Sequence, residues 1–382
     1  NPTQTTTRTS RHVCTPRQVP GTPLKSPFEF PFPRRTAHES VVKRKPEKTK
    51  TTKVKKATLL LALLGTLSAC TTTPATSPTT NVAFDGERPQ RSFRFDYKAD
   101  LAAEAADEQL RLWLPLPSNT PDQQIGELTI EASHPYEIKD LIEGNGRSLY
   151  MESTGEDLSI AVHFDVTRHA TAGGGSASAT EIAMGLRGAN MIPLGGKVAA
   201  VSASIKVNKN DTTMGVAKSL YDHTLERMNY AKPLNGDWGR GDAEWACDSR
   251  HGNCTDFHSY FMGLAQTRDI PARFVMGFPI SGAGETAGST DKVGGYHCWA
   301  YFYDTQEGWR PVDISEADKH PDKSEFFFGN LDENRLEMIG GRDVLLSPAP
   351  AAGRLNLFIY PYAESNGFST SRVQKAFQRT NL

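Results

Sequence analysis

The alternation of hydrophobic and polar residues in the first half of the chain predicts β-strands. Residues 92–97 read Ser-Phe-Arg-Phe-Asp-Tyr, and a period of two recurs over residues 109–114 and 158–166. This period places successive side chains on opposite faces of a strand, so that one face can be buried. We therefore expect a small antiparallel β domain of the sandwich type within residues 91–207, followed there by a linker rich in Gly and Ser.

The hydrophobic period becomes helical after residue 212. Val216 and Leu220 fall on one face and predict a helix that ends near Asn229, whereas residues 230–250 have the character of a loop. A second helical pattern begins at Cys254. Strands are expected downstream at the following positions: residues 272–277, 296–303, 308–314, 343–346 and 355–360. The expected fold class is therefore α+β, with a second domain over residues 212–382.

A basic and then apolar segment precedes the β domain. Lys53, Lys55 and Lys56 are followed by the uncharged run 57–69 and by Cys70. Because a membrane span needs about 20 apolar residues, a run of this length predicts a secretory signal, here residues 54–70. The end of the run, Leu67-Ser68-Ala69-Cys70, resembles the lipobox of bacterial lipoproteins, in which the cysteine is acylated and becomes the mature N-terminus.

The lipobox resemblance implies a protein of the bacterial cell envelope, attached to the membrane through a lipid on Cys70 and facing the periplasm or another extracytoplasmic space. Residues 71–90, rich in Thr, Pro and Ser, predict a flexible tether. Residues 1–53 are crowded with Thr, Pro, Lys and Arg. We interpret them as a disordered stretch or as upstream sequence translated from a start that was assigned too early.

The charge of the chain is distributed unevenly. The whole sequence has a formal net charge of −1, but residues 1–69 carry 14 Lys and Arg against 3 Glu, so a chain that begins at Cys70 would have a net charge of −12. An acidic protein is a poor partner for the phosphate backbone. We therefore expect no nucleic-acid binding.

Cys254 stands where the second helical pattern begins, directly after a turn at Gly252-Asn253. The first turn of a helix has unpaired backbone N–H groups and the positive end of the helix dipole. Both favour the thiolate over the thiol, and the thiolate is the nucleophilic form of cysteine. An arbitrary cysteine is more often a small buried residue than a nucleophile, so the assignment depends on a base elsewhere in the chain.

His297 and Asp313 supply the other groups that a nucleophilic cysteine needs. His297 begins the strand at residues 296–303, and Asp313 lies on the next strand, about one hairpin further along. If the two strands are antiparallel neighbours, their side chains can meet on one face. A thiol, a base that takes its proton and a carboxylate that orients the base form a catalytic triad.

Three sequence blocks resemble the bacterial transglutaminase-like domain, a papain-like fold for cysteine acyl transfer. The blocks begin at Gly252 (GNCTDFHSYF), Gly295 (GYHCWAYFY) and Gly308 (GWRPVDISEA), and they occur in the same order as in that family. The resemblance implies a helix carrying the cysteine packed on an antiparallel sheet, with Cys254 as nucleophile, His297 as base and acid, and Asp313 as the orienting carboxylate. Where many family members have Glu, this chain has Tyr301, which we expect to affect the strand surface more than the triad.

The resemblance further implies a peptide or glutamine amide as substrate, a thioester on Cys254, and water or an amine as the acyl acceptor. No cofactor is implied. The alternatives are a binding module of the cell envelope that has the fold without the activity, and a zinc site that uses several of the His and Cys residues. The spacing shows no Cys-x2-Cys or His-Glu-x2-His pair, so no metal site is predicted.

Cys247 and Cys298 complete the cysteines of the chain after Cys70. They can pair as a disulfide in an oxidising compartment, or both can remain buried thiols. Strand alternation places Cys298 on the face opposite His297, so it is not expected to act as a second nucleophile. His258, one helical turn after Cys254, is expected to be structural.

Overall fold

The computed structural model describes residues 87–382 except residues 209, 234–236 and 283–284. Cys70 and the predicted signal lie outside the described residues, and so does most of the predicted tether, so these assignments remain predictions. Within the described part, no helix is long and apolar enough to cross a membrane.

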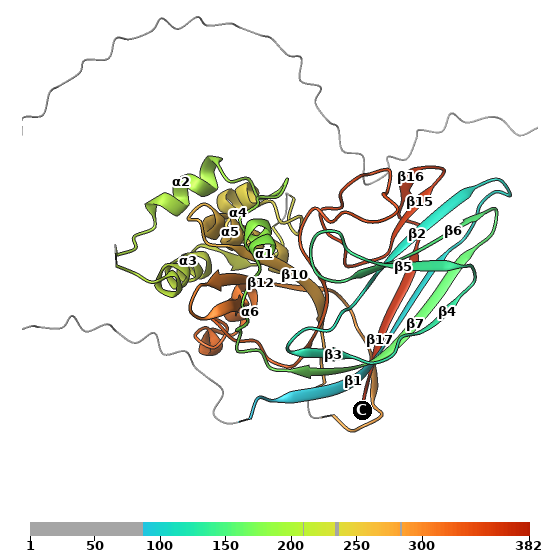
Figure 1. Cartoon of the computed structure of the whole chain (residues 1–382), viewed down its shortest axis with the longest axis horizontal. Helices are drawn as coiled ribbons and strands as arrows, with labels where there is room; N and C mark the ends of the chain where they lie inside the picture. The colour runs from blue at the N-terminus through green and yellow to red at the C-terminus, as the bar shows by residue number, and fades with distance from the viewer. Residues whose placement is uncertain (1–86, 209, 234–236, 283–284) are drawn as a thin grey trace, which may run out of the picture. The chain divides into compact units, whose positions relative to one another are not determined.

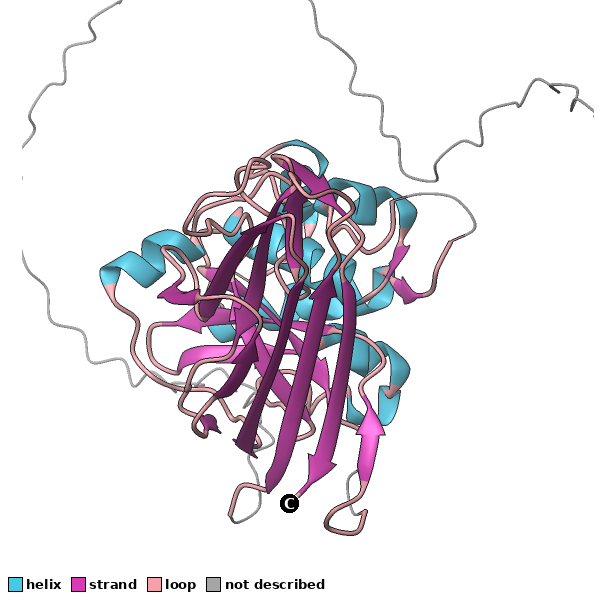
Figure 2. Ribbon diagram, turned by 90° about the vertical axis from the view of Figure 1, so that its right-hand side faces the viewer, coloured by secondary structure: helices cyan, strands magenta, loops and turns pink. Residues whose placement is uncertain are grey.

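Two antiparallel sheets form the β domain, seen as the long strands in Figure 2. The first has the strand order β11-β17-β1-β7-β3, with β4 also paired to β7, and the second has the order β16-β15-β2-β6-β5. Alternate residues of β1 and β7 are buried in one continuous core, as the period of two predicts, whereas β2 is buried without alternation from Leu112 to Leu116. The strands of the first sheet are β1 (Gln90–Leu101), β3 (Gln123–Ile125), β4 (Thr129–Ala132), β7 (Leu158–His169), β11 (Thr290–Lys292) and β17 (Gln374–Asn381). Those of the second are β2 (Gln109–Leu116), β5 (Tyr136–Asp140), β6 (Arg147–Thr154), β15 (Tyr362–Ser365) and β16 (Phe368–Thr370).

The C-terminal strands belong to the β domain, which differs from the predicted division of the chain at residue 212. β17 pairs with β1 along its length, and β15 pairs with β2. Figure 1 shows the red C-terminal strands beside the blue N-terminal ones. The sequence of β17, QKAFQRTN, has few apolar residues, and its partner lies more than 270 residues away. The local hydrophobic pattern therefore gives little information about which sheet contains β17.

A four-stranded antiparallel sheet with helices around it forms the other domain. The strand order is β13-β12-β10-β14, with β10 (Ala272–Pro279), β12 (His297–Asp304), β13 (Gly308–Val312) and β14 (Arg335–Gly340). The helices are α1 (Ala179–Gly185), α2 (Gly196–Ser204), α3 (Thr213–Arg227), α4 (Ala243–Ser249), α5 (Cys254–Gln266), α6 (Ile314–Lys319) and the short η1 (Pro321–Lys323). A two-stranded parallel pair, β8 (Asn229–Tyr230) and β9 (His251–Gly252), leads into α5.

Helix α5 is the centre of this domain. It packs on β12 and β10, and α2, α3, α4 and α6 lie against its other sides. All of its residues are buried, including the polar Thr255, Asp256 and His258. The predicted α+β class, with the cysteine-bearing helix packed on an antiparallel sheet and a β region before it, is confirmed.

Two local predictions differ from the structure. The expected loop at residues 230–250 contains helix α4, which Asp242 caps by accepting hydrogen bonds from the backbone N–H groups of Glu244 and Trp245. Seven residues are too few to reveal a helical period. The strands expected at residues 343–346 and 355–360 are reduced to a single bridge between Val344 and Leu355.

Candidate active site

Cys254 is the first residue of α5, as the sequence predicts. Asn253 caps the helix by accepting a hydrogen bond from the backbone N–H of Thr255, and Asp256 completes a capping box. Cys254 is 2% exposed. Its own backbone N–H makes no hydrogen bond to any described residue, so the thiol lies next to an unused donor at the positive end of the helix.

Asp256 holds the loop at residues 237–242 against the start of α5. Its Oδ2 accepts hydrogen bonds from the backbone N–H groups of Gly239 (2.6 Å) and Asn253 (3.0 Å), and Oδ1 accepts one from Gly241 (2.9 Å). Burial raises the pKa of Asp256 to about 6 against the opposing effect of these three donors. The loop that contains Trp238 is thereby fixed beside Cys254.

His297 and Asp313 meet as the sequence predicts. β12 and β13 are antiparallel neighbours, with Ala300 opposite Val312. The two residues therefore lie at the same end of the pair, and His297 Nε2 is 2.7 Å from Asp313 Oδ2. The Cys254 thiol lies close enough to His297 to contribute to the raised pKa of the imidazole.

Asp313 is fully buried and saturated with donors. Arg335 Nη1 donates to Oδ2 at 2.9 Å, and Oδ1 accepts hydrogen bonds from the Ser315 hydroxyl and the Glu316 backbone N–H, both at 3.1 Å. Burial by itself would raise the pKa of this carboxyl. The charges of His297 and Arg335 and the hydrogen bond from His297 outweigh burial and hold the pKa well below its usual range.

Arg335 was not found from the sequence, although it is the second cation on Asp313. It is 2% exposed, and its guanidinium carbon lies 5.1 Å from the centre of the Trp299 ring. Arg335 begins β14, a strand two positions away from β12 in the sheet. Only the sheet order brings it to Asp313, so an arginine in an otherwise ordinary stretch gives no local signal.

Cys254, His297 and Asp313 form the triad. The electrostatics of the triad favour an ion pair between Cys254 and His297. The hydrogen bond from the Cys298 thiol, then the contacts with His297, lower the pKa of Cys254 well below its ordinary value although burial opposes this. Burial disfavours the imidazolium, but the charge and hydrogen bond of Asp313, with the contact to Cys254, raise the pKa of His297 to about 10. A thiolate beside an imidazolium is therefore the stable state near neutral pH.

Cys298 lies beside the site although it alternates with His297 along β12. Cys298, Ala300 and Phe302 belong to the core that contains α5, whereas Trp299 and Tyr301 belong to a separate cluster on the opposite face. That Cys298 is not a second nucleophile stays a prediction, and its proximity to Cys254 was not predicted because it depends on where α5 begins above β12. There, Cys298 on the helix side and His297 at the strand end both reach the Cys254 thiol.

Cys247 and Cys298 do not form the disulfide that the sequence left open. Cys247, Cys254 and Cys298 are all free and buried. Cys298 is instead 3.5 Å from the Thr255 hydroxyl, and the Cys247 carbonyl accepts a hydrogen bond from Arg227. The alternative of two buried thiols therefore describes the structure.

His258 has a structural contact on each ring nitrogen. Its Nε2 accepts a hydrogen bond from the backbone N–H of Ile314 at 3.0 Å, so the proton of the neutral ring is on Nδ1, which lies 2.7 Å from the Cys254 carbonyl oxygen. Burial lowers the pKa of His258 and favours this neutral form. His258 thus ties the start of α5 to the residue after Asp313.

The His and Cys residues around Cys254 do not assemble a metal site. Across the residues that the structure describes, no group of three or more His, Cys, Asp or Glu side chains is arranged to hold a metal ion.

Tyr301 is not on the strand surface, where the sequence places it. It is 4% exposed and packs in the cluster with Trp299 and Trp309.

Comparison with known proteins identifies the class of this domain. Residues 199–314, which contain the triad, match the family described as the transglutaminase-like superfamily. The chain therefore carries a transglutaminase-like domain. An uncharacterized protein of Haemophilus influenzae is 35% identical over 143 residues, which are 30% of this chain and 38% of that protein.

One solved structure has a similar fold. A candidate cysteine protease from Cytophaga hutchinsonii, 14% identical, has a TM-score of 0.50 over 78% of this chain and 93% of its own. The periplasmic domain of TgpA from Pseudomonas aeruginosa is 15% identical, with a TM-score of 0.32 over 59% of this chain and 96% of its own. The first similarity extends beyond the matched 199–314 segment and supports the fold alone.

Proposed function

We propose that this protein is a cysteine-dependent acyl-transfer enzyme that acts on an amide of a peptide or protein. The observation that supports the proposal is the proximity of Cys254 at the start of α5 to His297, which is hydrogen-bonded to Asp313. The directions of the three pKa shifts favour the protonation states that the proposed roles require: a thiolate, an imidazolium and a carboxylate.

In the proposed reaction the Cys254 thiolate attacks the amide carbonyl carbon. As the C–N bond breaks, the imidazolium of His297 gives its proton to the leaving amine, and a thioester remains on Cys254. Neutral His297 then takes a proton from water or from an acceptor amine, which attacks the thioester and releases the acyl group. With water the reaction is hydrolysis, and with an amine it is transamidation.

The negative charge that develops on the carbonyl oxygen needs hydrogen-bond donors. The backbone N–H of Cys254, unused by the described residues, is the first candidate. A second donor from the loop at residues 237–245 is part of the proposal, because Asp256 holds this loop at the start of α5 through Gly239 and Gly241. The Gly239 and Gly241 N–H groups are already occupied, so we assign the role to a side chain of the loop.

We also propose that the reaction takes place in the bacterial cell envelope, on a protein held to the membrane through a lipid on Cys70. The support for this location is the basic and apolar segment before Cys70 and its lipobox-like end. Mass spectrometry of the protein from its own membranes checks it. Acylated Cys70 as the N-terminal residue is expected, and a mature protein that retains residues before Cys70 contradicts it.

Site-directed labelling tests the proposed chemistry without knowledge of the natural substrate. Iodoacetamide at pH 6 is expected to alkylate Cys254 in the native protein far faster than Cys247 or Cys298, and His297→Gln is expected to slow that labelling. Cys254→Ala should also abolish both proteolysis of a casein substrate and incorporation of a fluorescent amine into it. Cys247→Ala should retain whichever of these two activities the native protein has.

Two results would contradict the proposal. One is labelling of Cys254 at pH 6 that does not depend on His297. The other is retained hydrolysis or amine incorporation in Cys254→Ala with a native unfolding curve. A native protein that labels as expected but transforms no amide would favour the alternative of a binding module.

A further inference from the structure

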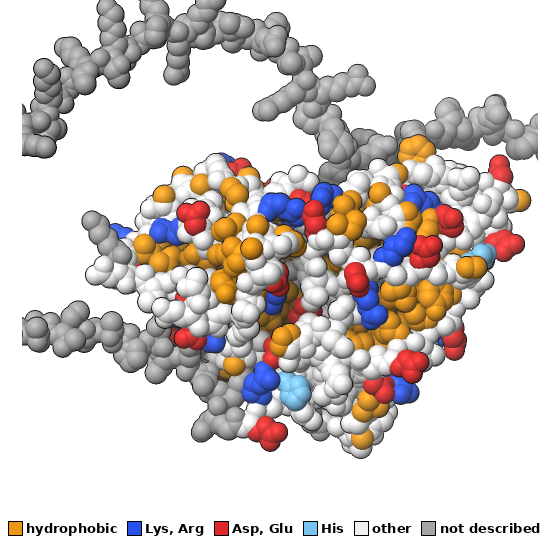
Figure 3. Space-filling model, in the orientation of Figure 1, with side chains coloured by type: hydrophobic (Ala, Val, Ile, Leu, Met, Phe, Trp, Pro, Cys, Tyr) orange, Lys and Arg blue, Asp and Glu red, His pale blue; other side chains and the backbone are white. Residues whose placement is uncertain are grey.

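A cavity of about 710 Å³ lies between the β domain and the transglutaminase-like domain. Its walls come from β10, β12, β13 and β14, from α1 and α5, and from the loops at residues 119–122 and 143–145. Figure 3 shows the surface hollowed between the helices and the β domain, with basic and acidic side chains near the hollow. None of the triad residues lines it. The volume is in the range of pockets that bind small ligands, about 300–1,000 Å³.

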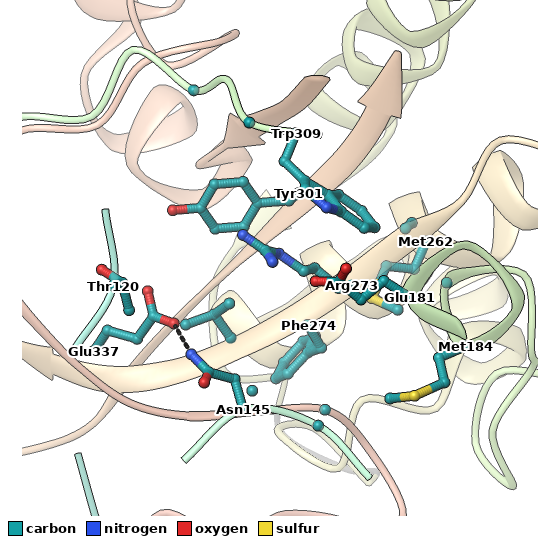
Figure 4. A pocket seen from close by; sticks show the side chains of 18 of the residues that line it. Thr120, Asn145, Glu181, Met184, Met262, Arg273, Phe274, Tyr301, Trp309 and Glu337 are labelled. Atoms are coloured by element: carbon teal, nitrogen blue, oxygen red, sulfur yellow. Dashed lines mark hydrogen bonds between the residues drawn. The ribbon is translucent and has the colours of Figure 1, made fainter. Parts of the chain in front are cut away.

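Arg273 presents an unpaired cation to this cavity. Its guanidinium carbon is 4.4 Å from the centre of the Tyr301 ring and 4.6 Å from that of Trp309. Figure 4 shows the guanidinium extending alongside both aromatic side chains. Within the described part of the chain it makes no ion pair, and its buried Nε has no hydrogen-bond partner. The aromatic contacts hold the group in place, while its N–H edge remains available to a carboxylate.

Glu337 presents an unpaired anion to the same cavity. It is 6% exposed, and its carboxylate accepts one hydrogen bond, from Asn145 Nδ2 at 3.2 Å, drawn in Figure 4. No cation among the described residues lies within ion-pair distance of it. A buried carboxylate without a cation is costly unless something in the cavity compensates it.

The other charged side chains around the cavity have partners of their own. Asp122 pairs with Arg88, and Glu143 pairs with Arg187 and Arg354. The remaining two are held by hydrogen bonds: Glu181 by the capping box with Ser178, and Arg342 by Ser259, Asn356 and backbone carbonyl groups. Among the charged residues of the cavity that the structure describes, Arg273 and Glu337 therefore have the fewest compensating contacts, and the charge of Arg273 also helps to lower the pKa of Glu181.

We propose that the cavity is a binding site for a short zwitterionic peptide, with the C-terminal carboxylate on the guanidinium of Arg273 and the N-terminal ammonium on the carboxylate of Glu337. The sheet register separates these two charges. Glu337 is opposite Gly277, four residues along β10 from Arg273, which is about 13 Å along the strand. Figure 4 shows the Arg273 side chain extending toward the side of the cavity on which Glu337 lies, so a peptide of two or three residues, at about 3.3–3.6 Å each, suits the remaining gap.

The walls between the two charges suit such a ligand. Met184, Met262, Phe274 and Val275 provide apolar surface for its side chains. Gln266 Oε1 and Trp309 Nε1, from two residues that line the cavity, are a buried acceptor and a buried donor without a partner among the described residues. Because Asn145 and the loop at 119–122 come from the β domain, the bound peptide would touch both domains. This inference does not rest on the proposed function.

Calorimetry with a blocked and unblocked peptide series tests the site. Leucyl-leucine is titrated into the Cys254→Ala protein, so that turnover plays no part, and is compared with its N-acetyl and its C-terminal amide derivatives. We expect the free dipeptide to bind, and each blocked derivative to bind at least about tenfold more weakly. Arg273→Gln should remove the preference for the free carboxylate and keep the preference for the free amine, and Glu337→Gln should do the reverse.

Arg94→Gln, which opens an exposed ion pair with Asp165 outside the cavity, is the matched control and should keep both preferences. Urea unfolding curves verify that the variants fold. If Arg273→Gln does not fold, Arg273→Lys replaces it, and the peptide series on the unaltered cavity decides alone. Absence of binding by leucyl-leucine and by trileucine overturns the proposal, as does binding that is indifferent to the two blocking groups or to both cavity substitutions. Loss of thiol labelling at Cys254 would count only against the proposed enzyme activity.

Discussion

The triad and the cavity use the same two strands in opposite ways. His297 begins β12 and Asp313 follows the end of β13, whereas Tyr301 and Trp309, further along these strands, form a wall of the cavity. In the triad each charge has an opposite charge within the protein: Asp313 contacts both His297 and Arg335, and Cys254 contacts His297. In the cavity, Arg273 and Glu337 form no ion pair with any residue that the structure describes.

Under the two proposals above, this difference separates groups that are organised for reaction from groups that bind a ligand. A buried network whose charges are all paired stays in one geometry without substrate, as preorganised catalysis requires. Unpaired buried charges are tolerated only where water or a ligand can reach them. Substitutions in the triad and in the cavity are therefore expected to differ in their effects on Cys254 labelling and on stability.

The largest expected effect is at Asp313. Asp313→Ala removes the carboxylate that raises the pKa of His297 and leaves buried Arg335 with Asp332 as its ion-pair partner. We expect alkylation of Cys254 by iodoacetamide at pH 6 to slow by at least about a hundredfold. Asp313→Asn, which keeps a hydrogen-bond acceptor but not the charge, should give an intermediate rate. Equal rates for the native and alanine proteins would contradict the role of Asp313.

Arg335→Met is expected to destabilise the fold by about 3–5 kcal/mol, because it leaves the Asp313 carboxylate buried with one cation fewer. Urea unfolding at pH 7 measures the change. Since the pKa of folded Asp313 lies below the unfolded value of about 3.9, the stabilisation is present above that pH and is lost in more acidic solution. The deficit of the variant should therefore shrink as the pH falls.

The exposed pair Arg94–Asp165 provides the control for this measurement. Arg94→Met is expected to change stability by no more than about 1 kcal/mol, because exposed ion pairs contribute little. Equal losses of unfolding free energy in Arg335→Met and Arg94→Met would show that the buried ion pair with Asp313 stabilises the fold no more than the exposed pair does.

Cys298→Ala is expected to shift the pH dependence of Cys254 labelling without abolishing it. The Cys298 thiol is the strongest cause of the lowered pKa of Cys254, so its removal raises that pKa and moves the rise in alkylation rate to higher pH. Rates well above the rise should agree with the native protein, and above about pH 10 both proteins should lose the ion pair as His297 is deprotonated. Cys247→Ala is the control, and an unshifted profile in Cys298→Ala would contradict the assignment.

The smallest effect is expected at Arg273. Arg273→Gln should leave the rate of Cys254 alkylation within about twofold of the native rate, because the triad pairs its charges without the cavity. A larger change would show that the triad and the cavity are coupled through β12 and β13 and are not independent.

Sequence pattern predicted the elements that carry their own periodicity. The helix expected from residue 212 to about Asn229 is α3 (Thr213–Arg227), and α5 begins at Cys254 as the turn before it indicates. The pairing of the strands at His297 and Asp313 followed from a short hairpin, in which neighbours in sequence are neighbours in space. The triad could therefore be predicted almost entirely from local signals.

Other features depend on contacts between distant segments. β17 joins β1, and Arg335 reaches Asp313, only through the order of strands in a sheet. The contact of Cys298 with Cys254 depends on where α5 lies above β12, which no alternation rule specifies. Arg273 and Glu337 are unremarkable charges in their own strands, and they become a pair only across a cavity between two domains.

The sequence by itself thus determined the positions of Cys254, His297 and Asp313, because the hydrophobic period and the turns place each of these residues at the end of a helix or strand. The tertiary structure decided which groups shift their pKa values and where the cavity of the proposed second site lies. Burial, charge pairing and the space between domains are properties of segments brought together by the fold, and they have no expression in the pattern of any one segment.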